Sequence, residues 1–213
     1  MTARPAGRSG RRAGDSKTSE AILEAARGQF AEHGYNGATI RAIAARAQVD
    51  PALVHHFYGT KEALFAAAMR LPVVPSEVLS AALASKPGDR GLGELIVRTA
   101  LTLWETDGVR ETFLGLLRSA VTSEDAAIML REFVAESILG TLVRIVDVRG
   151  TGAEVEYRAG MVATQMVGLG LTRLVLGLPA VAQASVDELA ATIGPSVERY
   201  LTGEIKLPDR FAG

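Results

Sequence analysis

The sequence predicts an all-α protein in which four short helices precede a larger helical body. Two observations support this prediction. Apolar residues recur at helical spacing along most of the chain, and no long stretch alternates apolar and polar residues as a strand would. Pro72 and Pro75 then interrupt the pattern after the fourth short helix, where we place the boundary between the two parts.

We divide the chain into four regions on this basis. They are a disordered basic arm (1–15), an N-terminal domain (16–72), a helical body (76–205) and a flexible tail (206–213). Within the body, helices are expected near 76–85, 91–106, 109–120, 124–148, 153–178 and 185–202.

Composition excludes several classes of protein. The 213 residues contain no cysteine, which rules out disulfides, thiolate metal sites and a thiol nucleophile. The N-terminus has no hydrophobic region of signal-peptide type. The longest apolar run, 161–181, still contains Gln165 and Arg173, so it is not expected to span a membrane. We expect a cytoplasmic protein that has no membrane partner.

The charge of the chain is distributed unevenly. Residues 1–70 carry ten Lys or Arg against six Asp or Glu, whereas residues 71–213 carry thirteen against eighteen, which sums to the net charge of −1. Arg4, Arg8, Arg11 and Arg12 lie in the first fourteen residues, where there is no acid. A basic N-terminal region on an acidic body favours contact with a polyanion, although a solvated disordered tail explains the same pattern.

The N-terminal domain begins with two helices. The first is expected from Ser16, with apolar residues at helical spacing in "SKTSEAILEAARGQFAEHG" and Gly34 as its C-terminal cap. Thr39 is a suitable N-cap for the second helix. The short segment "QVD" (residues 48–50) then separates the second helix from the third, a spacing typical of a helix-turn-helix unit.

The third helix is short and its outward face is polar. Asp50 and Pro51 favour a helix start, while "GT" (residues 59–60) ends this helix and caps the next. At about 100° per residue, a buried face centred on Val54 also includes the aromatic pair "FY" that follows the histidines. Ala52 and His56 then point outward. His55 lies on the flank and is also available for contact.

No pattern in the chain predicts catalysis, a metal site or a cofactor. His55 and His56 are adjacent, so they diverge by about 100° on a helix and cannot share a metal as an i, i+4 pair can. No HExxH motif is present, and "GDRGLGE" (residues 88–94) is not a phosphate-binding loop because it lacks the Walker spacing and a preceding strand. We therefore expect a non-enzyme without metal or cofactor.

The stretch "GYNGATIRAIAARAQVDPALVHHFYGTKEALF" resembles the DNA-binding domain of the TetR family of bacterial repressors. The matching elements are Gly34-Tyr35, Thr39, Ile43-Ala44, Ala47, Val49, the aromatic before Gly59-Thr60-Lys61-Glu62, and Leu64. The resemblance covers residues 16–65, and the rest of the chain matches only in helical layout. It implies a three-helix helix-turn-helix domain, joined by a fourth helix to a larger helical ligand-binding and dimerisation domain.

The resemblance also implies a set of DNA contacts. Thr39, His55 and Lys61 fall where the family contacts phosphate, and Arg41, Pro51, Ala52 and His56 fall where it contacts bases. The sequence departs from the common pattern at Gln48, which replaces a turn glycine, and at Asp50, Ala52 and His55, which replace serine, glycine and tyrosine. Gln48 therefore requires a turn that tolerates a side chain, possible in a left-handed conformation. Arginines of the arm could reach an adjacent minor groove.

For the body, the resemblance implies a homodimer and an effector site. We expect the dimer to form through the helices near 124–148 and 153–178, because "MVATQMVGLGLTRLVLGL" is apolar around most of its circumference; burial within one monomer is the alternative. Candidate pocket residues are the larger or polar side chains on otherwise aliphatic helices. They are Trp104, Phe113, Met129, Phe133, Met161, Gln165 and Met166, although residues of these types more often belong to a plain core.

The expected function is that of a repressor which binds a palindromic DNA operator as a homodimer. A small, hydrophobic effector would then release it. Two alternatives stay open. One is a DNA-binding regulator that has no effector, and the other is an all-α binding module or enzyme that has recruited the helix-turn-helix shape.

Overall fold

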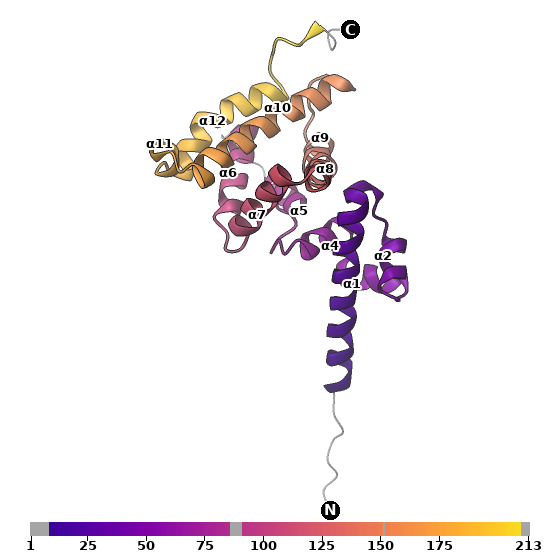
Figure 1. The fold of residues 1–213 in the computed structure, drawn as a ribbon. Coiled ribbons are helices and arrows are strands. Elements are labelled where there is room, and N and C mark those ends of the chain that lie inside the picture. The colour runs from indigo at the N-terminus through magenta and orange to yellow at the C-terminus, as the bar shows by residue number, and fades with distance from the viewer. Residues whose placement is uncertain (1–8, 86–90, 151, 210–213) are drawn as a thin grey trace, which may run out of the picture.

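The computed structural model describes residues 9–85, 91–150 and 152–209, with side chains from residue 15 onward. Within these ranges all regular structure is helical and no strand occurs, which confirms the all-α prediction. Figure 1 shows a small group of N-terminal helices beside a larger helical body, with the first helix extending away from the body toward the N-terminus.

The N-terminal domain has the four predicted helices. They are α1 (Ser9–Gly37), α2 (Ile40–Arg46), α3 (Pro51–Tyr58) and α4 (Lys61–Ala68). The start of α1 corrects the predicted boundary at Ser16, because residues 9–15, expected to be disordered, continue the helical backbone. Gly34 interrupts α1 with a φ of 70° and a ψ of −177°, a conformation at positive φ that glycine adopts readily.

Side chains of all four helices pack into one core. Ile22, Phe30, Ile43, Val54 and Leu64 are almost fully buried in it. An aromatic cluster closes the core on the side of the body. This cluster consists of Phe30, Tyr35 and Phe65 from the N-terminal domain and Phe133 from the body.

Local capping explains why the short helices begin where they do. The Thr39, Asp50 and Thr60 side chains accept hydrogen bonds from the backbone N–H groups of Ala42, Ala52 and Ala63 at 3.1, 2.7 and 3.0 Å. These three residues are the N-caps of α2, α3 and α4. Each cap satisfies a donor that the first helical turn leaves free, which stabilises a helix by about 1 kcal/mol.

The turn between α2 and α3 is a Schellman motif without glycine. Gln48 has a φ of 57°, as the left-handed position requires. The N–H of Val49 donates to the carbonyl of Ala44 at 3.0 Å, and that of Gln48 donates to Ala45 at 3.1 Å. The left-handed turn considered possible at Gln48 is therefore present, and it fixes the angle between the two helices.

The body contains the following elements: α5 (Pro75–Ala84), α6 (Leu92–Trp104), α7 (Val109–Thr122), α8 (Glu124–Phe133), η1 (Val134–Leu139), α9 (Gly140–Ile145), α10 (Ala153–Gly170), η2 (Leu171–Val175), α11 (Pro179–Ala182) and α12 (Val186–Leu201). Two of the predicted helices differ from prediction. The segment 124–148 is divided by the π-helix η1, and 153–178 continues from α10 into the π-helix η2. The break before 185 contains the short helix α11.

Helices α6 and α12 approach each other closely because glycines face each other between them. A Cβ atom on Gly194 would lie 2.7 Å from the backbone N and Cα of Glu94, and one on Gly93 would meet the carbonyl of Gly194. Val97 and Val197 are fully buried on the same pair of helices. The body core thus depends on a backbone-to-backbone contact that only glycine permits.

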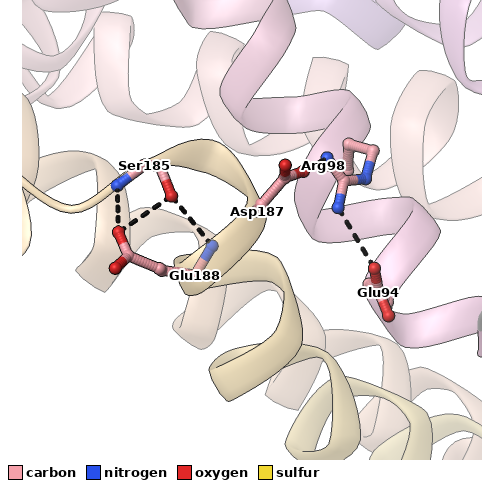
Figure 2. Close-up of polar contacts among 5 residues, drawn as sticks. All are labelled: Glu94, Arg98, Ser185, Asp187 and Glu188. Atoms are coloured by element: carbon pink, nitrogen blue, oxygen red, sulfur yellow. Dashed lines mark hydrogen bonds and ion pairs between the residues drawn. The ribbon is translucent and has the colours of Figure 1, made fainter.

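Polar contacts at the start of α12 reinforce this pair of helices (Figure 2). Arg98 of α6 forms ion pairs with Asp187 of α12 and, at 3.1 Å, with Glu94. These two partners raise the pKa of Arg98. Ser185 and Glu188 form a capping box, and the hydrogen bonds from Ser185 lower the pKa of Glu188. The N-terminal end of α12 is therefore fixed both to α6 and to its own cap.

None of the helices within residues 9–85, 91–150 and 152–209 combines the length and the apolar character needed to cross a membrane.

Candidate nucleic-acid interface

The exposed face of α3 is the centre of the candidate interface. Val54, which is only 1% exposed, anchors the helix in the N-terminal core. Ala52 and His56 are exposed on the opposite side, as predicted, and Pro51 is half-buried at the first turn. A short helix with small residues at its start and an imidazole further along can approach base edges in a major groove.

Leu53 belongs to the same face, and sequence reasoning missed it. Its side chain is 39% exposed, although leucine normally lies in a core. The helical wheel contained the signal, because Leu53 lies about 100° from Val54 and therefore at the edge of the outward face. Leu53 adds an apolar surface to the polar one of His56.

His55 lies on the flank and caps the end of α3. Its Nδ1 is 2.9 Å from the carbonyl oxygen of Gly59. Since a carbonyl can only accept, Nδ1 carries the proton and donates. This bond leaves Nε2 as the ring nitrogen that can contact another group.

Thr39 and Arg41 lie at the start of α2 and are both exposed. The Thr39 oxygen accepts the capping bond, while its hydroxyl proton can still be donated to another acceptor. The two residues therefore add an exposed hydroxyl and an exposed guanidinium at the start of α2, the first helix of the helix-turn-helix unit.

Lys61, at the first position of α4, is half-buried, and its ammonium lies against the end of α1. Its ammonium donates to the carbonyl of Asn36 at 3.3 Å and lies 4.7 Å from the centre of the Tyr35 ring. Burial lowers the pKa of Lys61, while the carboxylates of Glu136 and Glu132 act in the opposite direction. The predicted phosphate ligand is thus also part of the contact between the domains.

The side chains of the basic arm (1–15) lie, up to residue 14, outside the part of the chain that the structure describes. Arg4 and Arg8 lie outside the described residues, and for Arg11 and Arg12 only the backbone of α1 is described.

The body contains an apolar cavity of about 200 Å³ between α5, α6, α7, the α8–η1–α9 segment and α10. Four of the seven predicted pocket residues line it: Trp104, Phe113, Phe133 and Met166. Trp104 and Phe113 stack with ring centroids 5.2 Å apart. The rest of the lining is aliphatic apart from Thr99, and it contains no charged side chain.

The other three predicted pocket residues do not line this cavity. Met129 packs instead against the core of the N-terminal domain. On α10 the lining residues are Val162, Ala163, Met166 and Val167. Met161 and Gln165 share a neighbouring stripe, one residue or about 100° away around the helix.

A second apolar surface, which we call the exposed strip, lies at the end of α10 and along η2. It consists of Val167, Leu171, Val175, Leu176 and Leu178, whose exposed fractions range from 41% to 59%. The structure describes all of 124–148. In that segment Ile145 is the large apolar side chain whose exposed fraction, 48%, falls in the same range. Of the two segments predicted to form the dimer, 153–178 therefore carries most of the exposed apolar surface.

Comparisons with known proteins cover both domains. A family model described as "Bacterial regulatory proteins, tetR family" matches residues 22–68, and one described as "Tetracyclin repressor-like, C-terminal domain" matches residues 91–201. The HTH-type transcriptional repressor AcnR of Corynebacterium glutamicum is 45% identical over 60 residues, which are 27% of this chain and 32% of that protein. The HTH-type transcriptional repressor SCO4008 of Streptomyces coelicolor is 39% identical over 70 residues, or 29% of this chain and 36% of that protein.

The chain thus spans about a third of the length of these curated relatives. One solved structure matches over a longer range. The TetR-family regulator SCO0857 of Streptomyces coelicolor is 36% identical, and the match covers 94% of this chain and 98% of that chain with a TM-score of 0.42.

The capped α2–turn–α3 unit, supported by α1 and α4, is a helix-turn-helix fold of the kind that reads DNA. The match to the C-terminal family model covers just over half of the chain, and the N-terminal model covers the helix-turn-helix unit. This chain belongs to the TetR family of bacterial regulatory proteins.

Among the described residues, no three His, Asp or Glu side chains come together in a way that could hold a metal ion.

Proposed function

We propose that the protein is a cytoplasmic transcriptional repressor that binds a palindromic operator as a homodimer. The observation that carries this proposal is the outward face of α3, where Ala52, Leu53 and His56 are exposed on a helix fixed at both ends. Phosphate contacts from Thr39, His55 and Lys61 would position that helix, and Arg41 and Pro51 would add base contacts beside it. The names of the relatives, both repressors, support the direction of regulation.

The homodimer is proposed to form through the exposed strip. One recognition helix gives little specificity, whereas two that are related by a two-fold axis read two half-sites. The strip is a continuous apolar surface of the kind that marks a protein interface. It lies in the body, away from α3, so a dimer formed there leaves both recognition helices accessible.

The effector is proposed to be a small, uncharged, hydrophobic molecule bound in the apolar cavity. Support comes from the lining, in which Thr99 is the polar side chain and no charged group is present. Three buried or partly buried arginines of the body are already paired elsewhere: Arg98 with Glu94, Arg158 with Glu154 and Arg173 with Glu105. A charged ligand would therefore be buried without a partner, which is unfavourable.

A second candidate is a regulator that acts without an effector. The size of the cavity favours it, because about 200 Å³ is below the range of roughly 300–1,000 Å³ typical of small-molecule sites. Operator binding is common to both candidates. They differ in whether any uncharged hydrophobic compound lowers operator affinity and raises the melting temperature of the protein.

The experiment that tests the function is a genome-wide footprint with the purified protein. We expect protected palindromic sites, with His56→Ala and Arg41→Ala each weakening specific binding about tenfold or more, in line with 1–3 kcal/mol per base contact. Lys61→Ala should weaken binding to all sequences equally and flatten its salt dependence. Arg110→Ala, in the body, is the control and should bind as the parent does. Absence of any protected site would overturn the proposal.

A further inference from the structure

The segment at residues 132–137, which we call the bridge segment, belongs to the body but forms part of both domains. Phe133 lines the cavity and is only 3% exposed. The same ring stacks on Phe65, with centroids 4.4 Å apart, and meets the edge of Tyr35 at 5.4 Å. One aromatic side chain is therefore both a wall of the cavity and a member of the N-terminal core.

Polar groups of the bridge segment fix the turn that precedes α2. The N–H of Asn36 donates to Oε2 of Glu132 at 2.9 Å. The same carboxylate covers Gly34, where a Cβ atom would lie 2.7 Å from Oε2. One turn later, the Ser137 hydroxyl donates to the Tyr35 hydroxyl at 3.3 Å in a buried environment.

These bonds act on residues next to the candidate DNA contacts. The turn at residues 34–36 lies directly before the Thr39 cap of α2, and the carbonyl of Asn36 accepts from Lys61. Burial raises the pKa of Tyr35, and the carboxylates of Glu62 and Glu136 act in the same direction, so its hydroxyl stays protonated and available for hydrogen bonding. A shift of the bridge segment would therefore move the turn, Thr39 and Lys61 together.

The backbone of the bridge segment leaves the α-helical conformation at Val134. Residues 134–139 form the π-helix η1, which ends where the N–H of Gly140 donates to the carbonyl of Ala135. A π-turn contains one residue more than an α-turn, and such turns often mark functional positions in helices. Val134, Ile138 and Leu139 of η1 line the cavity, so a molecule inside it would press directly on this turn.

We infer that the bridge segment transmits occupancy of the cavity to the DNA-binding face, with Glu132 as the positioning residue. This inference rests on the proposed function and names the route of its regulation. Filling the cavity displaces Phe133 and η1, the Glu132–Asn36 and Ser137–Tyr35 bonds carry the displacement to the turn at 34–36, and the two recognition helices lose the spacing that fits the operator. The coupling is measurable as the change in the free energy of operator binding when the cavity is filled.

The test replaces the unknown effector with a side chain. Ala163→Leu, on the α10 wall, fills part of the cavity, and Ala100→Leu on the α6 wall is a second filling variant in case the first does not fold. The response is the operator dissociation constant of a filled protein divided by that of its unfilled counterpart. We expect a response of at least about fivefold in the parent, the lower end of typical allosteric coupling.

The same ratio is then measured after the polar bonds are removed. In a Glu132→Ala, Ser137→Ala background we expect the response to fall below about twofold, because residues that do not interact have additive effects. Glu132→Gln, which keeps an acceptor for the Asn36 N–H, should restore it. Glu124→Ala is the matched control, since it removes the same charge from an exposed position at the start of α8, outside the bridge segment, and should leave the response intact.

Two results would overturn the inference: an equal response with and without Glu132 and Ser137, or filled variants that fold and bind the operator as the parent does. Thermal unfolding establishes that each variant is folded. The ratio is measured on a fragment that the parent already protects, so a negative result here is distinct from a failure of the proposed function.

Discussion

At the scale of single residues, the outward face of α3 combines two chemistries. His56 offers ring nitrogens that can donate to or accept from base edges, whereas Leu53 offers methyl groups that can only make apolar contact. In a major groove the matching apolar group is the C5-methyl of thymine. We therefore predict that Leu53 favours an operator with a thymine at the position it faces.

The prediction is tested with operators in which each thymine is replaced in turn by deoxyuridine, which lacks only that methyl group. At one position per half-site, the parent should lose about fourfold in affinity, the equivalent of about 0.8 kcal/mol for one buried methyl group. Leu53→Ala should bind more weakly and be insensitive to that replacement. Fluorescence anisotropy measures both. If no position distinguishes the parent from Leu53→Ala, Leu53 does not contact a thymine.

Sequence reasoning was most reliable where one residue determines a local conformation. The caps formed by Thr39, Asp50 and Thr60 each join residues two or three apart in the sequence, so all three caps could be predicted. The orientation of Lys61 could not, because it depends on Tyr35 and on carboxylates of the body about seventy residues away in the sequence. Contacts made across domains leave no local pattern.

At the scale of secondary-structure elements, the order of the helices follows from the sequence, but the π-turns do not. Periodicity places helices at 124–148 and 153–178, because apolar spacing hardly changes when one extra residue enters a turn. The same extra residue rotates everything after it by about 100°. The faces of Met161 and Gln165 illustrate a related difficulty, since the apolar residues of α10 surround most of its circumference and do not single out the side that faces a cavity.

The close contact of α6 and α12 gives a prediction at this scale. Gly194→Ala should destabilise the protein by about 1–3 kcal/mol, because the new methyl group would meet the backbone of Glu94 and force the helices apart. Gly115→Ala is the matched control: Gly115 is also inside a helix, but nothing lies within 4 Å of an added Cβ. That substitution should be stabilising by about 0.5–1 kcal/mol. Urea denaturation compares the two, and equal effects would contradict the prediction.

At the scale of the whole molecule, the exposed strip, which we propose as the dimer surface, and the candidate DNA interface lie on different elements. The strip is confined to the end of α10 and the residues that follow, whereas the candidate interface is confined to α2, α3 and the start of α4. Substitutions can therefore alter one surface without touching the other. Any energetic coupling between the two surfaces must pass through the helices of the body that lie between them.

The dimer prediction uses this separation. Leu171→Asp places a charge in the centre of the strip and should produce monomers, since a buried unpaired carboxylate is strongly unfavourable. Operator affinity should fall at least about a hundredfold because only one half-site can then be read. Val121→Asp is the control, as Val121 is 87% exposed at the end of α7, outside the strip. Sedimentation equilibrium measures the mass, and a Leu171→Asp dimer would place the interface elsewhere.

Phe133 has one more consequence, for the exchange of domains between relatives. Its ring completes the aromatic cluster of Phe30, Tyr35 and Phe65. The core of the N-terminal domain therefore includes a side chain that the body supplies. A chimaera that joins residues 1–72 to the body of another regulator would inherit whatever side chain that body supplies at this position. An aromatic ring at this position would let the transplanted N-terminal domain fold and respond to an effector. A small residue would leave a void beside Phe65. Compatibility between the two domains thus depends in part on a side chain of the body that completes the core of the N-terminal domain.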